Sequence, residues 1–178
     1  MGQYYHCCFL NEKKNQPVKW FSPWKHDNGA KLMEHSYIGN NYCAAVENDL
    51  IDNPQYVVWA GDYADEEKRS KTNLYQRCTE KTEAQNTNQE KVSLDYFVIN
   101  YTKKTYYKRG DVKPFYDGWI INPLPLLTSE GNGRGGGDYR GAEGQSLVGL
   151  WARDLIGLSL EEPGEDFVRA TPFFSEKW

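Results

Sequence analysis

The stretch YYHCCFLNEKKNQPVKWF, residues 4–21, sets the fold class because it has the pattern of a β-hairpin. Its first seven residues are mostly apolar or aromatic and favour a strand, and its last four supply the partner strand. Between them, NEKKNQP provides turn residues and a proline where pairing resumes. The same pattern returns at residues 94–110, LDYFVINYTKKTYYKRG. The sequence therefore predicts a sheet built from hairpins.

Other segments add a helix and further strands to this sheet. Residues 28–52 predict one helical segment, capped by Asp27 or Asn28, that packs on a face of the sheet. QYVVWAG, residues 55–61, predicts a buried strand, and LVGLWARDLIGLSL also has strand composition. We expect an α+β fold, mainly antiparallel sheet, formed by residues 1–178 as a single domain.

The composition limits the classes of partner. Aromatic residues make up 15% of the chain, with 13 tyrosines and six tryptophans, which suits a sheet whose large side chains are buried. The net charge of −4 lacks the basic excess of a nucleic-acid-binding protein. A protein partner is therefore the first expectation, and nucleic acid is a weaker one. No run approaches the length of a membrane span, so no membrane association is expected.

The four cysteines, Cys7, Cys8, Cys43 and Cys78, form no Cys-x-x-Cys pair. We expect free thiols in a reducing cytosol, and hence a cytoplasmic protein. The three histidines have neither zinc-finger nor HExxH spacing, so no metal site and no cofactor are predicted.

The middle of the chain differs in character from both ends. Residues 64–93 are polar and mixed in charge, and few large apolar side chains occur among residues 64–90. We expect residues 64–90 to contribute little to the core and to form a solvated insertion.

The segments on either side of this insertion resemble each other. Each hairpin is followed, 45 or 47 positions after its second turn lysine, by a Trp-Ala-x-Asp sequence, at residues 59–62 and at residues 151–154. Matched order and spacing suggest an internal duplication with halves 1–63 and 94–158. The alternative is coincidence between two ordinary hairpins. A duplication predicts that both tryptophans are buried on comparable strands.

Three short motifs carry a resemblance to known proteins. MGQYY at the start, WAGDYAD at 59–65 and GNGRGGGDY at 131–139 resemble an uncharacterised group of small bacterial and mobile-element proteins. The resemblance implies a phage or mobile-element setting. It implies no catalytic or binding residue, because the group has no settled activity.

The segment EGNGRGGGDYRG, residues 130–141, is the main candidate site. Glycines free to adopt positive φ can direct successive backbone N–H groups at one anion, and arginines can add bidentate donors. The competing interpretation is a tight structural connection, and no Walker A or G-x-G-x-x-G sequence leading into a helix is present. The candidate ligand- or partner-binding residues are Arg134, Gly135, Gly136, Gly137, Asp138 and Arg140.

Two secondary candidates are weighed against structural roles. Asp62 and Asp154 close the Trp-Ala-x-Asp sequences and could form a paired site, or simply cap turns. Basic residues alternating with tyrosines on the second hairpin could contact nucleic acid, or could protect a sheet edge. The hairpin candidates are Lys103, Lys104, Tyr106 and Lys108.

The sequence leaves three functional hypotheses. The first is a non-catalytic cytosolic binding protein, encoded by a phage or mobile element, that inhibits a host defence macromolecule. The second is a small hydrolase or transferase that holds a phosphate-bearing substrate at the glycine-rich segment. The third is a small-molecule binder that uses the same segment without turnover. No catalytic residue is assigned.

Overall fold

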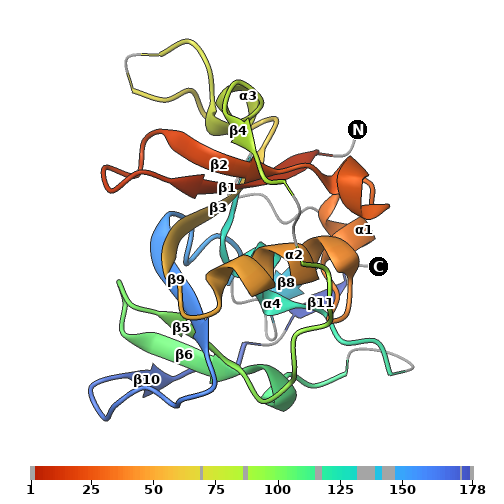
Figure 1. Cartoon of the computed structure of the whole chain (residues 1–178), viewed down its shortest axis with the longest axis vertical. Helices are drawn as coiled ribbons and strands as arrows, with labels where there is room; N and C mark the ends of the chain where they lie inside the picture. The colour runs from red at the N-terminus through yellow and green to blue at the C-terminus, as the bar shows by residue number, and fades with distance from the viewer. Residues whose placement is uncertain are drawn as a thin grey trace.

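The structure is a computed structural model that describes residues 3–68, 70–85, 88–114, 118–131, 139–141, 147–172 and 174–176. Within these ranges one large sheet contains nine strands in the order β10-β6-β5-β9-β3-β1-β2-β4, with β7 also paired to β3 (Figure 1). Most neighbouring pairs are antiparallel, as the sequence predicts. The strands of this sheet are β1 (Tyr5–Leu10), β2 (Pro17–Phe21), β3 (Gln55–Gly61), β4 (Thr82–Glu83), β5 (Phe97–Asn100), β6 (Thr105–Lys108), β7 (Ser129–Glu130), β9 (Asp154–Ser159) and β10 (Val168–Arg169).

Among the described residues the helical segments are short, and one of them has more than five residues. A separate two-stranded sheet pairs β8 (Tyr139–Gly141) with β11 (Phe174–Glu176). No helix in the described parts of the chain has the length and apolar character needed to span a membrane. The helices are η1 (Pro23–His26), α1 (Leu32–His35), α2 (Asn41–Leu50), α3 (Leu74–Cys78), η2 (Arg109–Asp111) and α4 (Pro123–Leu127).

The helical segment expected over residues 28–52 is divided into α1 and α2. The side chain of Asn40 accepts hydrogen bonds from the backbone N–H groups of Tyr42 and Cys43 and begins α2 there. The predicted cap at Asp27 or Asn28 is wrong, because Asp27 ends η1 in a left-handed conformation with φ of 55° and the residue that caps α1 is Lys31. The main helix therefore begins later than the sequence pattern indicates.

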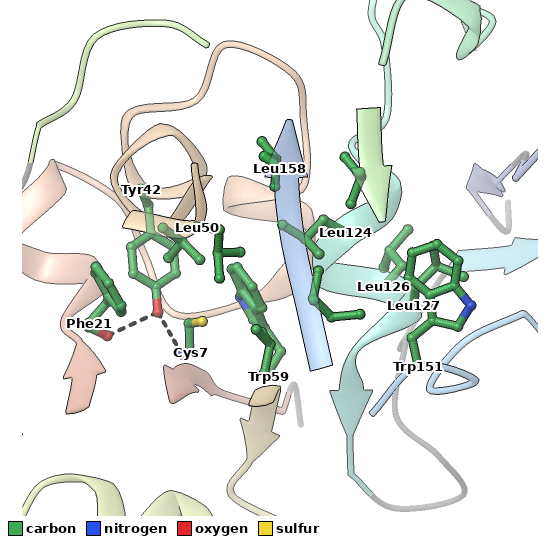
Figure 2. Packing of buried hydrophobic residues seen from close by; sticks show 14 of the residues in the cluster. Cys7, Phe21, Tyr42, Leu50, Trp59, Leu124, Leu126, Leu127, Trp151 and Leu158 are labelled. Carbon is green, nitrogen blue, oxygen red and sulfur yellow. Dashed lines mark hydrogen bonds between the residues drawn. The ribbon is translucent and has the colours of Figure 1, made fainter. Parts of the chain in front are cut away.

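One face of the sheet, the inner face, holds the main core. Trp59 and Cys7 on neighbouring strands pack with Tyr42 and Leu50 of α2 and with leucines of α4 (Figure 2). The Tyr42 hydroxyl accepts a hydrogen bond from the Cys7 backbone N–H and donates one to the Phe21 carbonyl. Helix α2 is thus fixed to the first hairpin by both apolar and polar contacts.

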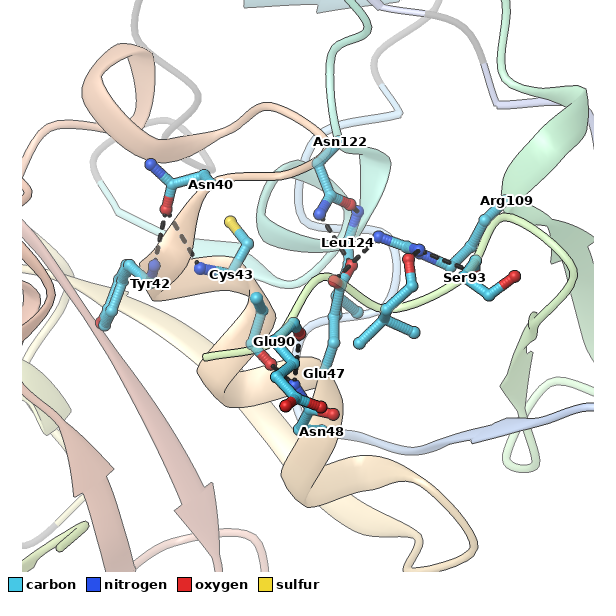
Figure 3. Close-up of polar contacts among 12 residues, drawn as sticks. Asn40, Tyr42, Cys43, Glu47, Asn48, Glu90, Ser93, Arg109, Asn122 and Leu124 are labelled. Carbon is cyan, nitrogen blue, oxygen red and sulfur yellow. Dashed lines mark hydrogen bonds and ion pairs between the residues drawn. The ribbon is translucent and has the colours of Figure 1, made fainter. Parts of the chain in front are cut away.

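A buried ion pair joins α2 to the second hairpin. Arg109 donates to the Glu47 carboxylate at 2.9 Å and to the Ser93 carbonyl, and Asn122 donates to the second Glu47 oxygen at 2.8 Å (Figure 3). Both charged side chains are buried. Removing one partner would leave an uncompensated charge in the core, so the pair fixes how the hairpin packs on the helix.

The opposite face of the sheet is the outer face. Its packing contradicts the expectation that residues 64–90 contribute little to the core. Leu74 and Cys78 of α3 are fully buried against Cys8 and Val58, and Cys78 forms a disulfide with Cys8. That part of the segment belongs to the core, because Leu74 and Cys78 of the short helix α3 both pack on the outer face. The expectation of free thiols is wrong for this pair, while Cys7 and Cys43 are free and buried.

The proposed duplication is not confirmed. Trp59 and Trp151 are both buried, but Trp59 lies within β3 whereas Trp151 lies in a turn before β9. Asp62 follows a strand and Asp154 begins one, so the two aspartates do not occupy equivalent strand ends.

Candidate functional site

Strand β3 changes its neighbour partway along one edge. Gln55 to Val57 pair with antiparallel β9, and Trp59 and Ala60 pair with parallel β7. The turn before β9 meets this junction, where the Arg153 backbone N–H donates to the Val57 carbonyl at 2.8 Å. Because residues paired across strands share a face, Glu130 lies on the outer face beside Ala60.

The Arg153 side chain connects three segments at this junction. Its Nε donates to Glu130 at 2.7 Å, its Nη2 donates to both Glu130 and Glu67, and its Nη1 donates to Glu67 and to the Lys14 carbonyl, both at 3.2 Å. All five N–H donors are therefore used. We name this arrangement of Arg153, Glu67, Glu130 and the Lys14 carbonyl the arginine clasp.

Local structure holds each part of the clasp in place. Lys14 and Arg153 adopt left-handed backbone conformations, with φ of 57° and 64°. Glu67 belongs to a loop closed by its own backbone hydrogen bonds with Ser70 and Thr72. Asn73 then caps α3 and donates to the Asp62 and Ala64 carbonyls, which ties this loop to the end of β3.

The clasp forms part of the wall of a cavity of about 960 Å³, the outer-face pocket. The turn between β1 and β2 and the loop after β3 both extend beyond the sheet on the left of Figure 1, and the pocket lies between them. The described lining residues are Lys13, Lys14, Asn15, Gln16, Asp65, Glu66, Glu67, Lys68, Ser70, Thr72, Arg77, Glu80, Glu130, Gly131 and Arg153.

The two carboxylates stabilise the charged form of Arg153. Burial alone would lower the pKa of Arg153, but hydrogen bonds to Glu130 and Glu67 outweigh it and raise the pKa above its ordinary value. Because its donors are already occupied, Arg153 orders the pocket wall and leaves ligand contacts to the other side chains.

The glycine-rich segment reaches this pocket at its first glycine. Gly131 lines the cavity directly after Glu130, which belongs to the clasp. The predicted residues Arg134, Gly135, Gly136, Gly137 and Asp138 lie outside the described residues. The backbone of Arg140 lies in β8, opposite Ser175 of β11.

The two aspartates of the secondary prediction are not brought together. Asp62 accepts a hydrogen bond from the Tyr4 backbone N–H at 3.0 Å and so closes the end of β3. Asp154 is buried, accepts a hydrogen bond from Asn100 at 2.8 Å and pairs with Lys103. Each aspartate thus has a structural role at a different place.

The basic hairpin is largely neutralised by acidic neighbours. Lys104 pairs with Asp166 at 2.7 Å, the Tyr106 hydroxyl donates to Glu162 at 2.6 Å, and Lys108 lies 3.8 Å from Asp95. With Lys103 bound to Asp154, all four hairpin candidates have acidic partners. This arrangement favours the structural interpretation of the hairpin over nucleic-acid contact.

No histidine is among the described lining residues of the outer-face pocket. Trp59 donates its indole N–H to His35 Nε2 at 3.1 Å, and His35 Nδ1 lies 3.3 Å from the Gly29 carbonyl oxygen. Burial lowers the pKa of His35 to about 4, and burial also lowers the pKa of His6 to about 4. No group of three histidine, cysteine or carboxylate side chains suited to a metal occurs within the described ranges.

Sequence reasoning missed the clasp itself. Arg153 is the variable residue of the second Trp-Ala-x-Asp sequence, Glu130 opens the glycine-rich segment, and Glu67 follows WAGDYAD closely. The signal was present, since each motif has a charged residue inside or beside it, but the sequence does not indicate that the charges meet.

Comparison of the chain with protein-family models, curated proteins and solved structures finds no match. Function is therefore inferred from the residues of this chain.

Proposed function

We propose that this protein is a binding protein that holds a small hydrophilic ligand in the outer-face pocket. The observation that carries the proposal is the convergence of separate motifs on one cavity. Residues from WAGDYADEE, from the second Trp-Ala-x-Asp sequence and from the start of the glycine-rich segment all line it.

The clasp supports binding because it fixes the pocket before a ligand arrives. One guanidinium holds two carboxylates and a turn carbonyl, so this part of the pocket wall has a defined geometry. A preformed site loses less conformational entropy on binding than a mobile one. The volume of about 960 Å³ also lies at the upper end of the range usual for small-molecule sites.

Thermal denaturation with a panel of hydrophilic compounds tests the proposal. The panel contains sugars, sugar phosphates, nucleotides, amino acids and polyamines, and a ligand at 100 times its Kd should add about 2.7 kcal/mol of stability. Asn15→Trp places a large ring in the pocket, and Glu12→Trp places the same ring on the same turn outside the described lining. Both positions are exposed.

The ligand should stabilise the wild type and Glu12→Trp but not Asn15→Trp. A panel without any stabilising compound, or a stabilisation that persists in Asn15→Trp, contradicts the proposal.

A second candidate function is the inhibition of a host defence macromolecule, which would suit the phage or mobile-element setting that the motif resemblance implies. Its support is a pair of tyrosines at the end of β3, because Tyr4 and Tyr63 flank Asp62 and are 44% and 47% exposed. Exposed tyrosines are common at protein interfaces. Affinity capture from host lysate should recover one stoichiometric partner with the wild type and lose it with a Tyr4→Ser/Tyr63→Ser double variant. Equal recovery with both proteins rejects this function.

A further inference from the structure

The clasp pairs some of the charged side chains of the outer-face pocket and leaves the others outside it. Five basic and five acidic residues line the pocket, and the clasp uses one arginine and two glutamates. Within the described part of the chain, the four remaining basic side chains have no carboxylate partner. These are Lys13, Lys14, Lys68 and Arg77.

Three of these cations belong to the turn between β1 and β2 or contact it. Lys13 and Lys14 belong to the turn, and Arg77 Nη1 donates to the Asn15 carbonyl at 3.0 Å. The turn is fixed from beneath, because Arg153 donates to the Lys14 carbonyl and the Lys14 ammonium lies 5.0 Å from the centre of the Tyr56 ring. Lysine and arginine side chains that line one pocket at an ordered turn suit a phosphate group.

The opposite side of the pocket offers hydrogen-bond acceptors and hydroxyls. Asp65, Glu66, Ser70 and Thr72 come from the loop after β3, and the amides of Asn15 and Gln16 complete the rim. Among the described lining residues, none is aromatic or aliphatic. This lining suits the hydroxyl groups of a sugar and provides no aromatic ring on which a nucleobase could stack.

We infer that the ligand is a sugar phosphate, with its phosphate at Lys13, Lys14 and Arg77 and its hydroxyls toward Asp65 and Glu66. The inference rests on the proposed function and specifies the ligand class of the same pocket. The shared chemistry is a phosphorylated pentose or hexose, either free or as the sugar-phosphate portion of a nucleotide.

Titration calorimetry with defined probes tests the inference. The probes are ribose 5-phosphate, glucose 6-phosphate and AMP, compared with ribose, glucose, inorganic phosphate and spermidine. A free sugar phosphate should bind at least about tenfold more tightly than its neutral sugar and than inorganic phosphate, since a charge-assisted contact contributes at least a factor of that size. AMP that binds more tightly than ribose 5-phosphate identifies a nucleotide as the source, and weaker AMP binding identifies a free sugar phosphate.

Two matched pairs of variants locate the groups. Lys13→Gln/Lys14→Gln should weaken ribose 5-phosphate about tenfold or more, whereas Lys81→Gln/Lys91→Gln, which changes two lysines outside the described lining, should not. Asp65→Asn/Glu66→Gln should weaken the sugar phosphate and leave inorganic phosphate unchanged. Asp95→Asn/Asp166→Asn, which changes two carboxylates outside that lining, should alter neither.

The outcomes separate this inference from the proposed function. Spermidine, an amino acid or a neutral sugar could bind as tightly as ribose 5-phosphate, with binding blocked by Asn15→Trp. The pocket would then be a binding site, but the assignment of its ligand as a sugar phosphate would be overturned. Full affinity in Lys13→Gln/Lys14→Gln overturns the phosphate position. If no hydrophilic compound binds at all, the proposed function fails first.

Discussion

The two Trp-Ala-x-Asp segments are identical at three of four positions and adopt different structures. Residues 59–61 are the end of a central strand, paired on both edges, while residues 151–153 form a turn that leads into β9. Trp59 packs among inner-face residues of the sheet, and Trp151 packs beside Tyr107 at a ring-centre distance of 5.9 Å. The same letters therefore specify burial of the tryptophan but not the conformation of the backbone.

The third position of each segment, Gly61 or Arg153, contacts the same residue, Glu130. At Gly61 a Cβ would lie 2.9 Å from the Glu130 carbonyl oxygen, so the close approach of β7 requires glycine. In the other segment the Arg153 side chain donates hydrogen bonds to the Glu130 carboxylate. Gly61 of the first segment leaves space for the Glu130 backbone, and Arg153 of the second segment pairs with the Glu130 carboxylate. The clasp depends on both segments.

The largest expected difference between the segments is in the cost of truncating the tryptophan. Trp59→Ala should destabilise the protein by about 5 kcal/mol and Trp151→Ala by about 3 kcal/mol, the two ends of the usual range for buried aromatics. The reason for the order is that Trp59 is fully buried and its loss leaves His35 without its indole donor. Urea denaturation measures both values, and equal losses would contradict the difference in setting.

Substitution of Gly61 should have the next largest effect. Gly61→Ala forces a methyl group against backbone and should cost about 1–3 kcal/mol, as overpacking usually does. Gly164→Ala is the control, because its Cβ would meet only a side-chain oxygen at 3.4 Å, and its change should stay within about 0.5 kcal/mol. If Gly61→Ala matches the control in chemical denaturation, β7 does not depend on this approach.

Burial of His35, which accepts the Trp59 hydrogen bond, should also make stability depend on pH. The folded-state pKa of His35, about 4, lies below its unfolded value of 6.5, so the unfolded chain binds the proton first as pH falls. Stability from His35 is full above pH 6.5, and about 2 kcal/mol of it should be lost between pH 7.5 and 5. His6, with the same lowered pKa, adds a similar share.

His35→Gln provides the comparison for this pH dependence. Glutamine can still accept the Trp59 N–H bond but does not titrate, so the variant should lose about half as much stability over the same pH interval. Denaturation midpoints at five pH values measure the slopes. Parallel curves for the two proteins would exclude His35 as the titrating group.

The smallest expected difference concerns the two aspartates. Asp154→Asn replaces a buried carboxylate that accepts a hydrogen bond from Asn100 and pairs with Lys103. It should lower the free energy of unfolding by about 1–2 kcal/mol. Asp62→Asn keeps an oxygen acceptor for the Tyr4 N–H at a partly exposed site and should change stability by less than about 0.5 kcal/mol. A reversed order in thermal denaturation would show that the end of β3 depends on the Asp62 charge.

Local pattern predicted the hairpins and the strand Gln55–Gly61 because period and turn chemistry act over a few residues. It failed for α3, where burial of Leu74 depends on the outer face of strands far away in sequence. It failed for the clasp for the same reason, since Arg153 lies 86 residues from Glu67 and 23 from Glu130. Long-range ion pairs produce no periodic pattern in the sequence. Charged residues near a motif are the only local sign of such pairs.

The most direct test of this account is the stabilisation of Arg153→Lys by ribose 5-phosphate, with Arg169→Lys as control. Arg169 pairs with Asp111 at an exposed position outside the described lining of the pocket, so its replacement should leave the melting-temperature shift unchanged. Lysine at 153 cannot hold two carboxylates and the Lys14 carbonyl at once, and the shift should disappear although the variant still unfolds cooperatively. A full shift in Arg153→Lys would contradict the claim that the clasp builds the ligand site.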